Sequence, residues 1–221
     1  MERLPVGLVV AYLVSAAVAV ASSLTGRRAL LIVTKPLTTA LLIAVAGPLG
    51  SSFSWLIHLG IALSLAGDVI LLIPAKGAFL LGLGVFLGAH LAYIVAFAQL
   101  PGSVAWLGLG VAVALVVVAT AGRTLVRAAA GRGMGAPVAA YLGVISVMAI
   151  AATRTAMPAA VLGAWLFVAS DSMLGWGEFV VGTTADGRSR GGRRLRLGVI
   201  TTYHAAQVLL VLALLLGAAA A

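Results

Sequence analysis

Cysteine is absent from the 221 residues of this chain, and only five residues are aspartate or glutamate. The lack of cysteine excludes disulfide bonds, thiolate catalysis and metal sites with cysteine ligands. Charged residues make up 9% of the chain, whereas they make up about a quarter of an ordinary soluble domain. Such a low charge content, in a chain that is 63% hydrophobic, argues against a soluble globular fold and against disorder.

The hydrophobic residues fall in long runs, and a helix needs about 20 of them to cross a membrane. Ala19-Val20-Ala21 resembles a signal-peptide cleavage site, but the first run is too long for a typical signal peptide, which favours a retained helix. The sequence predicts an all-α polytopic membrane protein, with residues 1–221 forming one domain of eight transmembrane helices. The predicted spans are 4–24, 29–49, 53–73, 78–99, 104–121, 136–152, 158–179 and 197–217.

The basic residues are distributed unevenly between the two sides of these spans. Eleven of the fourteen follow the first, third, fifth and seventh spans, whereas only Arg3 and Arg154 fall on the other side. Because cytoplasmic loops are rich in Lys and Arg, we expect a multi-pass protein of the cell (inner) membrane with both termini outside the cytoplasm. The net charge of +9 then reports orientation rather than a nucleic-acid partner, and residues 187–196 form a solvated cytoplasmic loop.

Several ionisable side chains lie inside the spans, where they are costly and usually functional. At 1.5 Å per residue, Lys35 and Asp68 lie roughly 9 Å from the cytoplasmic ends of their spans. Asp171 and Tyr203 fall at a similar depth, and His90 lies nearer the middle. This common depth predicts one polar layer in the cytoplasmic half of the protein.

Helical spacing groups these residues by face, because positions three or four apart are neighbours on a helix. Two alternatives stay open at this point: Lys35 can extend to the interface, or it can form a purely structural pair with Asp68. We interpret His58 as structural and Glu178 as interfacial, and Gly84-x-x-x-Gly88 predicts a close helix contact. The groups on shared faces are Lys35 with Thr38 and Thr39, Ser64 with Asp68, His90 with Tyr93, and Tyr203 with Gln207.

The order of polar residues also suggests an internal repeat. Asp68 in the third span corresponds to Asp171 in the seventh, and Tyr93 in the fourth span corresponds to Tyr203 in the eighth. The sequence thus predicts two parallel halves of four helices each. A polar layer near the midplane is also typical of transporters, so a small-molecule or lipid transporter is one alternative function.

Five short motifs occur in order along the chain, and together they resemble those of the YhhN/TMEM86 family from the second span through the eighth. Characterised members of that family are lysoplasmalogenases, which cleave the vinyl ether bond of lysoplasmalogens into a fatty aldehyde and a glycerophospho-headgroup. The resemblance implies a lipid hydrolase with a lysophospholipid substrate, and we expect it to need no cofactor. The motifs are Lys35-Pro36-Leu37-Thr38, Ser64-Leu65-Ala66-Gly67-Asp68, His90-Leu91-Ala92-Tyr93, Ser170-Asp171-Ser172 and Tyr203-His204-Ala205-Ala206-Gln207.

Hydrolysis of a vinyl ether needs a proton donor, a base for water and stabilisation of an oxocarbenium ion, which two carboxyl groups can share. We expect Asp68 and Asp171 to form this acid–base pair, with the individual roles unassigned. Burial disfavours a carboxylate and a nearby Lys35 favours it, so the two groups can differ in protonation. Lys35 holds the phosphate or tunes Asp68 in this hypothesis. The other residues expected to bind or orient the substrate are Thr38, Ser64, His90, Tyr93, Ser170, Tyr203 and Gln207.

A zinc-dependent hydrolase of the ceramidase-like type is the remaining alternative. The chain has three histidines, and two of them with one aspartate would suffice for zinc. His58, however, lies near the outer end of its span, far from the polar layer. We therefore expect no metal in the site.

Overall fold

A computed structural model of the chain describes residues 6–47, 53–75, 77–181 and 192–220. Within these ranges, the residues form nine α-helices and two short π-helical segments, and no strand. The elements are α1 (Val6–Thr25), α2 (Arg28–Ala46), α3 (Ser54–Leu71), α4 (Ala78–Ala98), α5 (Val104–Val117), η1 (Val118–Gly122), α6 (Arg123–Ala130), α7 (Gly135–Arg154), α8 (Pro158–Gly175), η2 (Trp176–Val181) and α9 (Gly192–Ala220).

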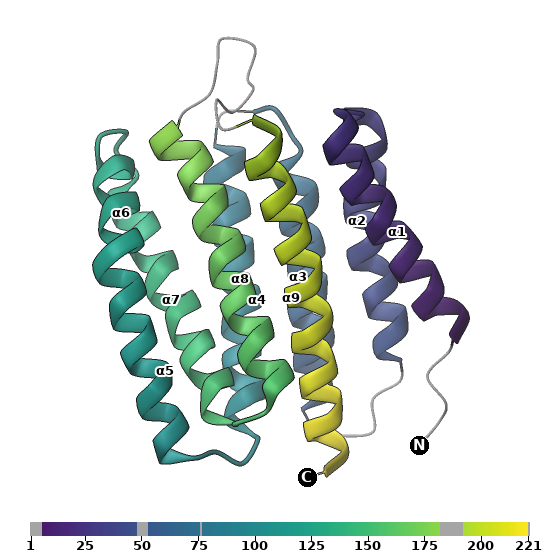
Figure 1. Cartoon of the computed structure of the whole chain (residues 1–221), viewed down its shortest axis with the longest axis vertical. Helices are drawn as coiled ribbons and strands as arrows, with labels where there is room; N and C mark the ends of the chain where they lie inside the picture. Colours follow the sequence, from purple (N-terminus) through teal and green to yellow (C-terminus); the bar gives the residue numbers. More distant parts are fainter. Residues whose placement is uncertain (1–5, 48–52, 76, 182–191, 221) are drawn as a thin grey trace.

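The helices form eight rods that run up and down side by side (Figure 1). The elements α5, η1 and α6 make one continuous rod, and α8 continues into η2. Seven of the described rods are long and apolar enough to cross a membrane, and α3, apolar over Trp55–Leu71, is somewhat shorter. A helix satisfies its own backbone polar groups, which a membrane interior requires. The prediction of an all-α polytopic membrane protein is confirmed.

Two predicted spans are longer in the structure than expected, because the helix continues through basic segments. The fifth span extends at its end, and the eighth extends at its start. The fifth was predicted to end at residue 121, but α6 continues the rod to Ala130, with Leu125 and Ala129 buried against α7. Arg123 and Arg127 therefore lie on a helix and not in a loop. Residues 187–191 of the predicted loop 187–196 lie outside the described residues. The remaining residues of that loop belong to α9, which begins at Gly192.

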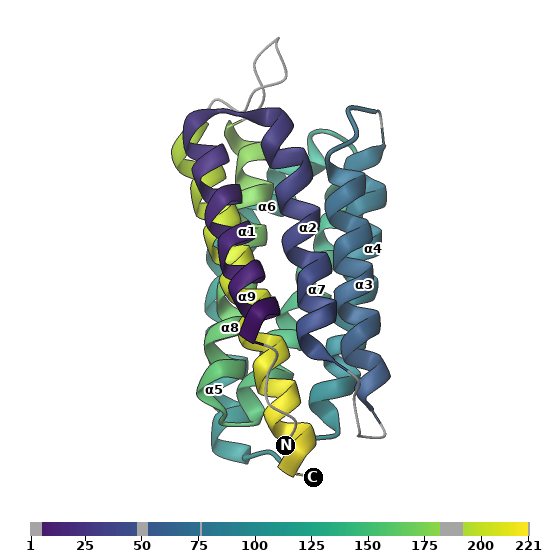
Figure 2. The ribbon, with the colours of Figure 1, turned by 90° about the vertical axis from the view of Figure 1, so that its right-hand side faces the viewer.

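The same pattern of neighbours occurs in both sets of four rods. In the first set α1 packs on α2, α2 on α3, and α3 on α4; in the second set α5 packs on α7, α7 on α8, and α8 on α9. Contacts of α4 with α7, and of α9 with α1, α2 and α3, join the two sets (Figure 2). Both α1 and α5 run upward in Figure 1, which supports the prediction of two parallel halves.

Glycine allows the closest approach between α8 and α9. A Cβ atom on Gly163 would lie 3.0 Å from the backbone nitrogen of Leu210, so the two backbones nearly touch.

Of the two glycines in the predicted contact at Gly84-x-x-x-Gly88, only the second meets a neighbouring helix. Gly88 faces Leu63 of α3, whereas no atom lies within 4 Å of where a Cβ would be at Gly84. Gly84 instead points away from the neighbouring helices.

We expect Gly163→Ala to lower the free energy of unfolding by about 1–3 kcal/mol, because the new methyl group collides with the backbone of α9. Gly84→Ala is the matched control, since its methyl group meets open space and should change stability by less than about 0.5 kcal/mol. Unfolding in mixed detergent micelles measures both. Equal effects of the two variants would contradict close packing at Gly163.

Candidate active site

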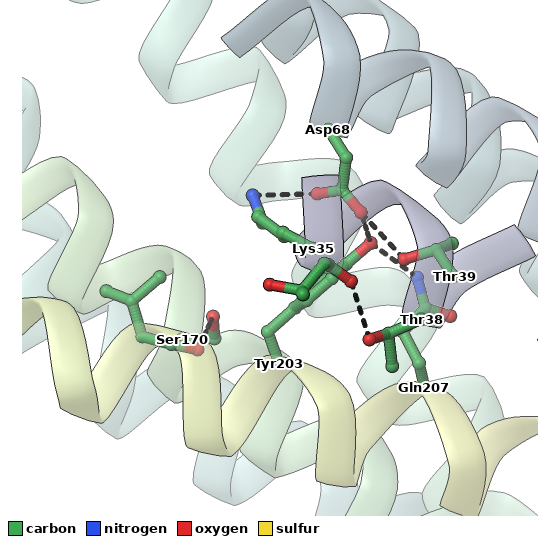
Figure 3. Close-up of polar contacts among 9 residues, drawn as sticks. Lys35, Thr38, Thr39, Asp68, Ser170, Tyr203 and Gln207 are labelled. Carbon is green, nitrogen blue, oxygen red and sulfur yellow. Dashed lines mark hydrogen bonds and ion pairs between the residues drawn. The ribbon is translucent and has the colours of Figure 1, made fainter. Parts of the chain in front are cut away.

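Asp68 lies near the end of α3 and is completely buried. Lys35 of α2 places Nζ 2.8 Å from Oδ1, and the hydroxyls of Thr39 and Tyr203 donate hydrogen bonds to Oδ2 at 2.8 and 2.7 Å. Figure 3 shows these three side chains converging on the carboxyl group. Because one cation and two hydroxyls contact it, Asp68 is held as a compensated carboxylate in a fixed position.

Asp171 forms a second group on α8. The Tyr141 hydroxyl donates a hydrogen bond to its Oδ2. His90 Nε2 lies 3.0 Å from the Tyr141 hydroxyl and 3.6 Å from the same carboxylate oxygen. His90 is fully buried, whereas the Asp171 side chain keeps 13% of its surface exposed. Asp171 is therefore the more accessible of the two aspartates.

Each aspartate is held by one helix of its own half and one helix of the other half. Asp68 on α3 contacts α2 of the first half and α9 of the second. Asp171 on α8 contacts α7 of the second half and α4 of the first. The Tyr93 hydroxyl of α4 donates to Gln207 Oε1 of α9 at 2.9 Å, which links the two groups of helices. The site is thus built at the junction of the halves.

Aromatic rings fill the space between the two aspartate groups. The Phe167 ring packs edge-on against His90, with centroids 4.7 Å apart, and against Tyr203 at 5.5 Å. Phe86 contacts both Phe167 and Tyr203. Its ring occupies the space beside Gly67, where a Cβ would lie 2.6 Å from Phe86 Cδ2. The glycine next to Asp68 therefore makes room for the aromatic cluster.

A narrow pocket opens beside Asp171, with a volume of about 40 Å³. Asp171 and Tyr141 supply its polar groups, and the rest of the wall is apolar. Among the wall residues are Leu71, Phe79, Phe86 and Phe179. Asp68 does not line it. The volume holds only a few water molecules, so an alkyl chain requires the walls to move apart.

Thr38, which was expected to bind or orient the substrate, makes no hydrogen bond to Asp68, whereas its neighbour Thr39 does. Thr38 lies 2.8 Å from the Ser15 hydroxyl and donates to the carbonyl of Thr34, so it contacts α1 and its own helix. Thr39, the next residue, makes the contact with Asp68. The sequence placed both on one face with Lys35, and only the position of the neighbouring helices distinguishes them.

Ser64 and Ser170 lie near the aspartates without bonding to them. Ser64 is fully buried one turn before Asp68 and adjoins Tyr93. The Ser170 hydroxyl donates to the Val199 carbonyl at 3.2 Å, which ties α8 to α9. Both serines therefore support the packing of the helices that carry the aspartates.

Tyr141 is the site residue that sequence reasoning missed. It is a single tyrosine in an otherwise small and apolar span, with no polar neighbour one turn away. The repeat offered a signal. In the first half, Lys35 on the second helix pairs with Asp68, and in the second half, Tyr141 on the corresponding helix pairs with Asp171. In the part of the chain that the structure describes, no three His, Asp or Glu residues cluster as metal ligands would.

Comparison with known proteins places the chain in a family. The model of the YhhN family matches residues 30–214. A protein of Mycobacterium bovis named "Lysoplasmalogenase" is 36% identical over 174 residues, which cover 76% of this chain and 62% of that protein. "Lysoplasmalogenase TMEM86B" of Rattus norvegicus is 31% identical over 166 residues, which cover 75% of this chain and 64% of the rat protein.

The chain therefore spans less than two thirds of the length of these relatives. No solved structure matches it. The family match includes Lys35, Asp68, His90, Asp171 and Tyr203. This multi-pass membrane protein belongs to the YhhN family.

Proposed function

We propose that the protein is a lysoplasmalogenase, which hydrolyses the vinyl ether bond of a lysoplasmalogen to a fatty aldehyde and a glycerophospho-headgroup. The observation that carries the proposal is a carboxyl group, Asp171, exposed at an apolar pocket with Tyr141 bonded to it. An apolar pocket suits a fatty chain, and the carboxyl group supplies the proton that the reaction needs. The names of the relatives from Mycobacterium bovis and Rattus norvegicus support the same activity.

Asp171 is the proton donor in this proposal. Its Oδ2 accepts the Tyr141 hydrogen bond, and its Oδ1 accepts none from the described residues, so Oδ1 is available to the substrate. The proton moves to the alkene carbon remote from the ether oxygen and leaves an oxocarbenium ion. Water adds to this ion and gives its proton to the Asp171 carboxylate, and the resulting hemiacetal collapses to the aldehyde and the alcohol.

Asp68 is the partner carboxylate, and it forms an ion pair with Lys35. Its negative charge favours the cationic intermediate, because charges in a low-dielectric interior interact strongly. Tyr203 connects Asp68 to Gln207, because Gln207 Nε2 donates a hydrogen bond to the tyrosine oxygen at 3.2 Å. This network fixes α9 against α4, where His90 and Tyr93 lie. Asp68 thus acts electrostatically, while Asp171 meets the substrate.

The orientation follows from the basic end of the bundle. The turn from α1 to α2, the end of α6 and the start of α9 lie at the upper side of Figure 1, opposite the start of α1 and the end of α9. By the helix bounds, these segments carry Arg27, Arg28, Arg127 and Arg194. We infer from the positive-inside rule that this end faces the cytoplasm of a cell with the protein in its inner membrane. The polar site then opens toward the cytoplasmic leaflet.

The decisive experiment incubates the purified protein with a 1-alkenyl lysophospholipid and, separately, with its saturated 1-alkyl counterpart. We expect one fatty aldehyde for each glycerophospho-headgroup released from the first lipid, and no product from the second. Because no metal takes part in the proposed reaction, treatment with a chelator should leave the rate unchanged. Absence of aldehyde from a folded protein contradicts the proposal, and loss of activity with chelator favours the zinc-dependent alternative.

A further inference from the structure

A second polar pair, Arg132 and Glu178, lies next to the wall of the pocket beside Asp171. Arg132, in the turn between α6 and α7, donates from Nη1 to the Glu178 carbonyl at 2.7 Å and lies 3.5 Å from Glu178 Oε1. The Arg132 guanidinium also lies 5.7 Å from the centre of the Phe179 ring, which is part of the pocket wall. Both charged side chains remain more than one third exposed. The guanidinium is therefore accessible to a ligand that enters the pocket.

The spacing between this pair and Asp171 matches the length of a lysophospholipid. Asp171 and Glu178 are seven residues apart on the rod of α8 and η2, a rise of about 10 Å. Seven bonds separate the phosphorus of a lysoplasmalogen from the alkene carbon that is protonated, or about 8 Å in an extended chain. A phosphate at Arg132 therefore puts the vinyl ether close to Asp171.

The other basic residues near the site have different surroundings. Lys35 is paired with Asp68, and it does not line the pocket. Arg123 and Arg127 line a separate groove of about 310 Å³ between η1, α6 and α7. Arg132 contacts Phe179 of the pocket wall, whereas Lys35, Arg123 and Arg127 are not among the residues that line the Asp171 pocket.

We propose that Arg132 binds the phosphate of the lysophospholipid at the mouth of the Asp171 pocket, and that Glu178 holds the guanidinium there until the lipid arrives. A guanidinium binds phosphate through paired charge-assisted hydrogen bonds, which the planar group is shaped to form. Of the two roles expected of Lys35, phosphate binding is assigned to Arg132 in this proposal, and contact with Asp68 stays with Lys35. This inference rests on the proposed function, because it takes the pocket as the substrate site.

The test compares Arg132→Gln with the unaltered protein on two substrates, a 1-alkenyl lysophospholipid and the 1-alkenylglycerol that lacks the phosphate. We expect KM for the phospholipid to rise about 10- to 100-fold with little change in kcat, because a charge-assisted bond is lost. KM for the alkenylglycerol should stay the same. Arg132→Lys, which keeps the charge but not the paired geometry, should give an intermediate KM. Arg123→Gln, on the other groove, is the matched control and should change neither substrate.

A binding measurement separates this inference from the proposed function. The saturated 1-alkyl lysophospholipid has the same phosphate and no cleavable bond, so its affinity is measurable whether or not the protein hydrolyses anything. We expect Arg132→Gln to weaken its binding by the same factor as KM. An equal change of KM for both substrates, or unchanged binding of the alkyl lipid, overturns the assignment of Arg132. Arg132-dependent binding without aldehyde production supports the phosphate site and contradicts only the proposed reaction.

Discussion

Replacement of Asp171 by asparagine is expected to lower kcat for vinyl ether hydrolysis by about 10²–10⁴-fold, which is the usual contribution of a general acid. Asparagine has nearly the same shape and still accepts the Tyr141 hydrogen bond, so the helices should stay packed. It cannot transfer a proton to the alkene carbon. Aldehyde formation by the purified variant, measured at saturating lipid, gives the effect directly.

Ser146→Ala is a suitable control for this experiment. Ser146 is buried on α7, the helix of Tyr141, but its hydroxyl donates only to the Leu142 carbonyl of its own helix. The variant should keep a rate close to that of the unaltered protein. If a folded Asp171→Asn variant retained more than about a tenth of the original kcat, Asp171 would not be the proton donor.

Replacement of Lys35 by methionine is expected to lower the free energy of unfolding by about 3–5 kcal/mol. Methionine has a similar length, so the main change is the loss of the ammonium group 2.8 Å from Asp68 Oδ1. The fully buried carboxylate then keeps only the hydroxyl donors Thr39 and Tyr203. Unfolding in mixed detergent micelles measures the loss.

The double variant Lys35→Met with Asp68→Asn distinguishes the ion pair from lost packing. Removing both charges leaves no uncompensated carboxylate, so we expect most of the lost stability to return. The double variant should nevertheless remain inactive, because the proposed reaction needs the Asp68 charge. A double variant less stable than Lys35→Met alone would show that the ion pair is not what stabilises this part of the bundle.

The sequence was sufficient to predict where several polar residues lie along their helices and which of them share a helix face. Helix length and the positions of Lys35, Asp68 and Asp171 along their spans follow from a constant rise per residue, and they place these groups in one layer. Helical spacing also pairs Tyr203 with Gln207, and the structure has a hydrogen bond between them. Such properties depend on one helix at a time and need no knowledge of its neighbours.

Contacts between two helices could not be predicted in this way. Thr38 and Thr39 are equally close to Lys35 in sequence, and only the packing of α1 and α3 on α2 decides which one meets Asp68. No neighbouring helix meets Gly84, although the spacing of Gly84 and Gly88 is typical of a helix contact. Tyr141 was missed for a similar reason, since nothing in its own span marks it as a partner of Asp171.

The order of the helices along the chain has a consequence for membrane insertion. An isolated aspartate at the centre of a helix costs about 2.5–3.5 kcal/mol to insert. Asp68 follows Lys35 in the chain, and Asp171 follows both His90 and Tyr141. During synthesis from the N-terminus, each of these carboxyl groups enters the bilayer after a helix that already carries a partner for it. The polar layer can therefore assemble step by step, with one partner of each carboxyl group already in the bilayer when that group enters.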